Sequence, residues 1–128
     1  DVSIDLLNED FNGLCFVNLV DFDALYGHRR DALGYAECVE SFDKKLNLFV
    51  ERLKQDDLLI ITADHGNDPT HIGTDHTREN VPLIVYSKNN NKPINLGLRE
   101  TFADVACTIA DNFNVEKPSI GKSFIEKI

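Results

Sequence analysis

The sequence predicts an α/β fold with a mostly parallel sheet flanked by helices. Apolar runs typical of strands alternate with amphipathic stretches typical of helices, in the order strand, helix, strand, loop, strand, helix. Two of the apolar runs are followed immediately by residues that can bind a metal. Sites in such sheets lie at the carboxyl ends of the strands, so both observations point to the same edge.

The first half of the chain predicts one strand and one long helix. The strand is the apolar run at residues 14–20, after the turn signal Asn12-Gly13. A loop at residues 25–31 follows, and Gly34 opens the helix. An apolar stripe, expected to face the core, recurs along this helix at Tyr35, Val39, Phe42, Leu46, Phe49 and Leu53.

The second half predicts two strands and a shorter helix. Residues 58–63 and 81–86 are the strands, and the polar loop at 64–80 between them is of a length that is usually functional or disordered. Thr101 to Asp104 resembles a capping box at the start of the helix. Its expected apolar face comprises Phe102, Val105, Ala106, Ile109 and Phe113.

Composition bounds the class of protein. With 128 residues, 42% of them hydrophobic and 27% charged, the chain can form one domain with a core. The net charge of −9 argues against a nucleic-acid partner. No apolar run approaches the ~20 residues of a membrane helix, and no signal peptide is visible, so a cytoplasmic protein without a membrane partner is expected. Cys15, Cys38 and Cys107 are expected to be reduced core cysteines.

Three clusters of Asp and His carry the chemistry. Asp64-His65 ends the apolar run at residues 58–63, Asp21 and Asp23 with His28 follow the run at 14–20, and Asp75-His76 lies further along the polar loop. Carboxylate oxygen together with imidazole nitrogen suits Mn or Zn better than Ca. A single Asp-His pair is more often an ordinary loop pair, but three clusters favour a binuclear metal site. His71 lacks a neighbouring acid and is expected at the surface or at a pocket rim.

Four stretches, at residues 18–31, 62–69, 73–79 and 99–104, resemble motifs of bacterial phosphopentomutases, which belong to the alkaline phosphatase superfamily. Asp-His-Gly is shared across that superfamily, whereas Asp-Phe-Asp with Gly-His-Arg-Arg, and Gly-Thr-Asp-His-Thr-Arg-Glu, are specific to this branch. The resemblance covers nearly all of the chain from about residue 10. It implies that residues 1–128 are the C-terminal part of an alkaline-phosphatase-like metal-binding core domain, without the N-terminal core segment and the cap domain.

The resemblance also implies two manganese ions. Asp23, His28 and His76 would hold one ion, and Asp64 and His65 would help to hold the other. Asp21, Asp75 and Arg78 would orient these ligands, although both acids could equally be turn or capping residues. Arg29, Arg30 and Arg78 could bind phosphate or pair with nearby carboxylates, and we favour the carboxylates.

The implied activity is the interconversion of ribose 1-phosphate, or deoxyribose 1-phosphate, and the 5-phosphate. It proceeds through a phosphothreonine enzyme with a sugar bisphosphate activator, either glucose 1,6-bisphosphate or ribose 1,5-bisphosphate. The nucleophilic threonine lies in the family's N-terminal part. Thr62, Thr70, Thr74 and Thr77 match no nucleophile motif, so the isolated chain has no catalytic residue and is expected to be inactive.

Two alternatives remain open. The chain could belong to another enzyme of the superfamily, such as a cofactor-independent phosphoglycerate mutase or a phosphatase. It could also be a non-catalytic metal-binding α/β module. The missing N-terminal part should leave a sheet edge and apolar surface uncovered, so we expect the fragment to self-associate.

Overall fold

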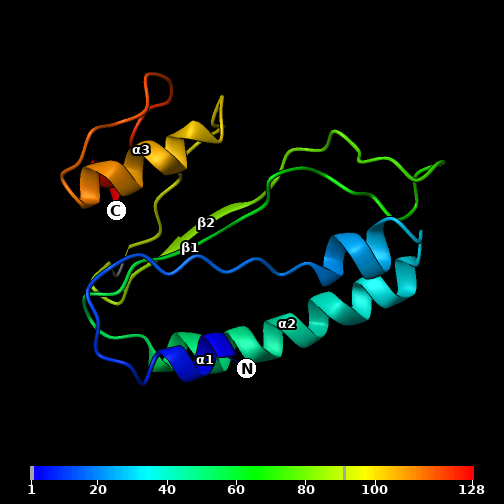
Figure 1. The fold of residues 1–128 in the computed structure, drawn as a ribbon, viewed down its shortest axis with the longest axis horizontal. Helices are drawn as coiled ribbons and strands as arrows, with labels where there is room; N and C mark the ends of the chain where they lie inside the picture. Colours follow the sequence, from blue (N-terminus) through cyan, green and yellow to red (C-terminus); the bar gives the residue numbers. More distant parts are fainter. Residues whose placement is uncertain (1, 91) are drawn as a thin grey trace. The chain divides into compact units, whose positions relative to one another are not determined.

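A computed structural model of the chain describes residues 2–90 and 92–128 (Figure 1). Its elements are α1 (Val2–Leu6), a π-helix (Phe22–Gly27), α2 (Ala32–Arg52), β1 (Leu59–Thr62), β2 (Leu83–Tyr86), α3 (Ala103–Asn112) and a 3-10 helix (Ile125–Lys127). The chain divides into two compact units. The first runs up to Lys54 and includes His65–Leu83, and the second comprises Gln55–Asp64 and Ile84–Ile128.

The long helix of the first unit is confirmed as α2. The Asp31 carboxylate accepts a hydrogen bond from the Gly34 amide at 2.9 Å, which caps the first turn. The prediction that an apolar stripe of this helix faces the core is confirmed only in part, because one of its members, Val39, is 45% exposed. The ring of Phe22 packs against those of Tyr35 and Phe42, with centroids 5.8 and 5.9 Å away. These contacts fasten the π-helix to α2.

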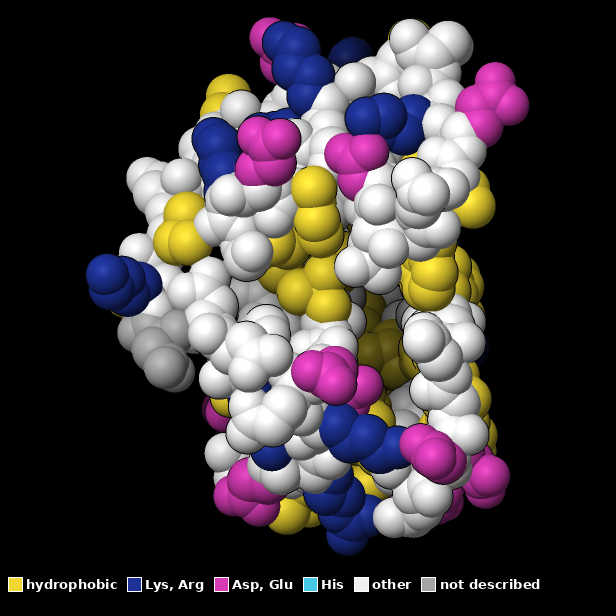
Figure 2. Space-filling view, turned by 90° about the vertical axis from the view of Figure 1, so that its left-hand side faces the viewer, with side chains coloured by type: hydrophobic (Ala, Val, Ile, Leu, Met, Phe, Trp, Pro, Cys, Tyr) yellow, Lys and Arg dark blue, Asp and Glu magenta, His cyan; other side chains and the backbone are white. Residues whose placement is uncertain are grey.

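The prediction of a strand at residues 14–20 is wrong, because the segment has no regular secondary structure. Its apolar side chains are exposed, Phe16 by 86% and Val17 by 46%. Apolar residues on both sides of a strand need neighbouring strands and covering layers, and within the described residues no strand pairs with this segment. Cys15 is therefore exposed instead of buried in a core. Apolar side chains are open to the surface in the space-filling view as well (Figure 2).

The sheet of the described chain has two antiparallel strands, β1 and β2, and a mostly parallel sheet is not seen. Both strands form inside the segments that the apolar runs predict. Consecutive strands can pair antiparallel through a returning loop, whereas parallel pairing needs a crossover, usually a helix. The segment between β1 and β2 contains no helix, so the chain turns back and pairs antiparallel.

The helix near the C-terminus is confirmed as α3, but its buried face is not the expected one. Phe102 and Phe113 are 55% and 39% exposed, and Ala106 is exposed too. The buried residues are Asp104, Cys107, Thr108 and Ala110. The C-terminal segment packs on this side, where the Cys107 thiol donates to the Ile120 carbonyl. Cys107 is thus the buried cysteine, and all three cysteines are free.

A polar network fixes the C-terminal segment against α3. The Asp104 carboxylate accepts from Arg99 Nε at 2.6 Å and from the Lys122 amide at 2.8 Å. The Thr108 hydroxyl donates to the Asp104 carbonyl and accepts from the amide of Phe124, which is 1% exposed. The expected capping box does not form, because the N-cap residue is Phe102 and makes no side-chain capping hydrogen bond. The Thr101 hydroxyl accepts from the Ala103 amide, but the Asp104 side chain is engaged elsewhere.

No described helix combines the length and the apolar character that crossing a membrane requires.

Replacing Asp104 with alanine should destabilise the second unit. The substitution removes two hydrogen bonds to a buried charged acceptor, each worth about 1.5–3 kcal/mol. Urea unfolding followed by circular dichroism measures the loss. The control Lys117→Ala breaks the exposed Lys117–Asp111 pair and should shift the midpoint less. Equal midpoints for Asp104→Ala and the unmodified chain would contradict this description of the network.

Candidate metal centre

The π-helix brings Asp23 and His28 together. The His28 amide donates to the Asp23 carbonyl at 2.9 Å, a bond that spans five residues instead of the four of an α-helix. The two side chains therefore lie one wide turn apart on the same side, and His28 Nε2 is 3.4 Å from Asp23 Oδ2. Asp21 precedes this helix, is exposed and makes no capping hydrogen bond, so it is not a capping acid.

The loop at residues 64–80 closes on itself and joins two further histidines. Gly66 and Thr77 form an antiparallel bridge in which the Thr77 amide donates to the Gly66 carbonyl at 3.0 Å. Their chain neighbours, His65 and His76, are thereby held together. The two imidazoles stack with centroids 3.6 Å apart and an interplanar angle of 20°.

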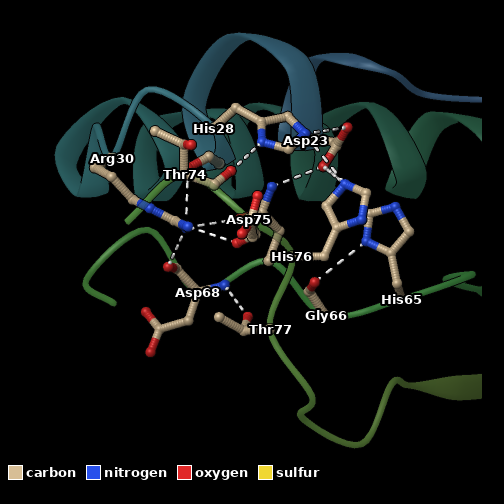
Figure 3. Close-up of polar contacts among 12 residues, drawn as sticks. Asp23, His28, Arg30, His65, Gly66, Asp68, Thr74, Asp75, His76 and Thr77 are labelled. Carbon is tan, nitrogen blue, oxygen red and sulfur yellow. Dashed lines mark hydrogen bonds and ion pairs between the residues drawn. The ribbon is translucent and has the colours of Figure 1, made fainter. Parts of the chain in front are cut away.

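The side chains of both segments converge on one point (Figure 3). His76 Nε2 lies 3.4 Å from Asp23 Oδ1 and 3.1 Å from His28 Nε2. One ligand atom each from Asp23, His65 and His76 also lies within 4.8 Å of the others. The structure thus places one carboxylate and three imidazoles in a single cluster, drawn from both segments of the first unit.

Backbone carbonyls set the tautomers of two of these imidazoles. His28 Nδ1 lies 2.6 Å from the Thr74 carbonyl, and His65 Nδ1 lies 3.2 Å from the Gly66 carbonyl. A carbonyl oxygen only accepts hydrogen bonds, so each Nδ1 carries the proton. The lone pair of a neutral ring then sits on Nε2. For His28, Nε2 is the atom that faces Asp23 and His76.

The environment of Asp23 favours its charged form. Burial by itself raises the pKa of this carboxyl, but a hydrogen bond from Asn67 and the nearby imidazoles of His28, His76 and His65 bring the pKa below its ordinary value. Asn67 Nδ2 donates to Asp23 Oδ1 at 2.7 Å. The cluster therefore holds an ionised oxygen ligand at neutral pH.

The cluster fits a divalent transition metal. Two ligand atoms about 2.1 Å from a tetrahedrally coordinated ion lie roughly 3.4 Å apart. His28 Nε2 lies 3.4 Å from one oxygen of the Asp23 carboxylate, His76 Nε2 lies 3.4 Å from the other oxygen, and the two Nε2 atoms lie 3.1 Å apart. Carboxylate oxygen and imidazole nitrogen together suit Mn or Zn. Asp23, His28 and His76 would hold one ion, and His65 adjoins them.

Other residues singled out in the sequence lie around the cluster or apart from it. Asp64 belongs to the second compact unit, and its role as a ligand stays a prediction. Asp75 contributes its backbone carbonyl, which accepts from Arg30 Nη2 at 2.6 Å. Arg78 is exposed. His71 is exposed as well, in agreement with the surface position expected for it.

The expectation for Arg30 needs correction. Its guanidinium pairs with no carboxylate among the described residues. It donates instead to backbone carbonyls and to the amide oxygen of Asn67, at 2.8 Å. Neither this arrangement nor the part played by Asn67 was found from the sequence. The available signal was that Asn67 lies two residues after His65 in a polar loop.

A model of one protein family matches the chain over residues 1–117. The family is the Metalloenzyme superfamily.

Replacing His76 with alanine should weaken manganese binding by this chain more than tenfold. Even the loss of a residue that only hydrogen-bonds to a metal ligand typically lowers metal affinity about 10–100-fold. Calorimetric titration with Mn²⁺ measures the dissociation constant. His71→Ala removes an exposed histidine of the same loop and should leave that constant unchanged. Equal affinities of the two variants would refute the assignment of His76.

Proposed function

We propose, because the chain belongs to the Metalloenzyme superfamily, that its Asp/His cluster holds a metal ion used in phosphoryl transfer. This superfamily is alkaline phosphatase-like and includes phosphopentomutases and related mutases. The observation that carries the proposal is the convergence of Asp23, His28 and His76 at the separations expected of ligands to one ion.

Within the superfamily we assign the chain to the phosphopentomutases. The stretches at residues 18–31 and 73–79 support this assignment, because they contain both the ligands and the strings typical of that branch. The substrate would be ribose 1-phosphate or deoxyribose 1-phosphate, converted to the 5-phosphate. Two manganese ions and a sugar bisphosphate activator would serve the reaction.

A bound divalent ion neutralises phosphoryl oxygens and stabilises the charge that develops in transfer. The protein's own groups prepare the site for it. Asp23 supplies a negative charge, held in place by the Asn67 amide. The Thr74 carbonyl keeps the proton of His28 on Nδ1, so that Nε2 is available as a ligand.

Two threonines of the loop, Thr77 and Thr70, hydrogen-bond within it. The Thr77 hydroxyl donates to Glu79 at 2.6 Å and accepts from the Asp68 amide at 2.6 Å. The Thr70 hydroxyl donates to the Asp68 carboxylate. Because the resemblance implies a nucleophile in the family's N-terminal part, we propose that the nucleophile belongs to an N-terminal part of the core, and that this chain is the C-terminal part of that domain.

The remaining expectations are part of the same proposal. The protein would act in the cytoplasm on a pentose phosphate. The isolated chain would be inactive and would self-associate, a tendency that the exposed apolar side chains at residues 14–20 support. There are two alternatives to this proposal. One is a phosphoglycerate mutase or a phosphatase of the same superfamily, and the other is a non-catalytic metal-binding module.

A substrate panel separates these possibilities. The intact protein that carries this sequence is assayed with Mn²⁺ and a sugar bisphosphate on ribose 5-phosphate, 3-phosphoglycerate and p-nitrophenyl phosphate. We expect turnover of the pentose phosphate, abolished by a chelator and restored by Mn²⁺. Turnover of 3-phosphoglycerate alone would assign the protein to the other mutase branch. Hydrolysis of p-nitrophenyl phosphate alone would indicate a phosphatase, and no turnover of any of them would favour the binding module.

A further inference from the structure

We propose that Arg30 is a positioning residue that clamps the loop carrying His65 and His76 onto the π-helix carrying Asp23 and His28, and so sets the metal affinity of the cluster. The inference rests on the metal binding proposed above. It assigns Arg30 neither a phosphate contact nor an ion pair, the two roles that its position in the sequence suggests.

The Arg30 guanidinium bridges separate stretches of the chain (Figure 3). Nη1 donates to the Asp68 carbonyl at 2.7 Å and to Asn67 Oδ1 at 2.8 Å, with a longer bond of 3.2 Å to the Gly27 carbonyl. Nη2 donates to the Asp75 carbonyl at 2.6 Å, and Nε donates to the Gly73 carbonyl. One side chain thus joins the end of the π-helix to both ends of the loop.

Three of these contacts lie beside a ligand or a group that supports one. Asn67 accepts from Arg30 through its oxygen and donates through its nitrogen to Asp23 at 2.7 Å. Gly73 precedes Thr74, whose carbonyl holds the ring of His28. Asp75 immediately precedes His76. Loss of the guanidinium would release all three supports together.

The chemistry of the acceptors explains why the residue is arginine. A guanidinium presents five N–H donors in a planar fork, which can serve several carbonyl oxygens at once. A lysine ammonium is a compact charge with three donors at one point and cannot span the same acceptors. Arg30 → Lys therefore retains the charge while removing the clamp.

The backbone at Arg30 supports the same conclusion. Its φ is +55°, in the left-handed region that glycine adopts freely and other residues avoid. Such a conformation persists when the surroundings over-determine it. The hydrogen bonds of the guanidinium supply that constraint. Glycine adopts this backbone conformation freely, so Arg30→Gly removes the side chain without adding backbone strain.

The test compares metal binding by Arg30→Gly, Arg30→Lys and the unmodified chain in calorimetric titrations with Mn²⁺. We expect the dissociation constant to rise about 10–100-fold in both variants, the usual cost of losing a group that orients metal ligands. Arg29→Gly is the matched control, because Arg29 is the exposed neighbour and should leave the constant unchanged. Hydrogen exchange of the metal-free chain should be faster at residues 66–77 in Arg30→Gly and Arg30→Lys, and unchanged in Arg29→Gly.

The outcomes separate this inference from the proposed function. An unmodified chain that binds no Mn²⁺ overturns both. Normal binding by Arg30→Gly overturns only the clamp, and full binding by Arg30→Lys shows that charge alone suffices and also overturns it. If Arg30→Gly fails to fold, Asn67→Ala decides, since it cuts the link to Asp23 and should raise the dissociation constant at least severalfold. No change in that variant would contradict the inference.

Discussion

The hydrogen bond from the His28 amide to the Asp23 carbonyl sets the geometry on which the rest of the candidate centre depends. In an α-helix each residue advances by 100°, so two side chains five positions apart would diverge by roughly 140°. The wider π-helical turn removes that divergence and places the carboxylate beside the imidazole. Phe22, packed on Tyr35 and Phe42, fastens the turn to the longest helix of the unit.

The loop completes the centre by a second and independent device. The bridge between Gly66 and Thr77 aligns His65 with His76, and the Arg30 guanidinium ties the loop to the end of the π-helix. The ligands are held by the Thr74 carbonyl at His28, the Gly66 carbonyl at His65 and the Asn67 amide at Asp23. A site prepared in this way loses little freedom when an ion binds, which is what high affinity requires.

Hydrophobic periodicity predicted the elements that depend on local pattern, and it failed where partners decide the structure. The long helix and the strands within residues 58–63 and 81–86 form as expected, although the helix begins at Ala32, two residues before Gly34. The apolar run at residues 14–20 has the composition of a strand but no strand pairs with it in the described chain. The face of α3 was predicted wrongly because its polar residues, Asp104 and Thr108, are the ones that the C-terminal segment covers.

The candidate ligands were visible in the sequence, but their supports were not. Clusters of Asp and His can be recognised in a sequence as candidate metal ligands. The structure brings together Asp23, His28 and His76, which the resemblance grouped around one ion. His65 joins them through a loop bridge that no periodicity encodes. The π-helix left no signal either, since sequence patterns distinguish periods of 3.6 and 2. Asn67 and Arg30 act through contacts across the loop, which only the folded chain shows.

The most direct test of the account is anomalous diffraction from crystals of the chain grown with Mn²⁺. We predict a single strong manganese peak in contact with the Asp23 carboxylate and with Nε2 of both His28 and His76. The absence of a peak at these three side chains at saturating Mn²⁺ would contradict the assignment of this cluster as a metal centre.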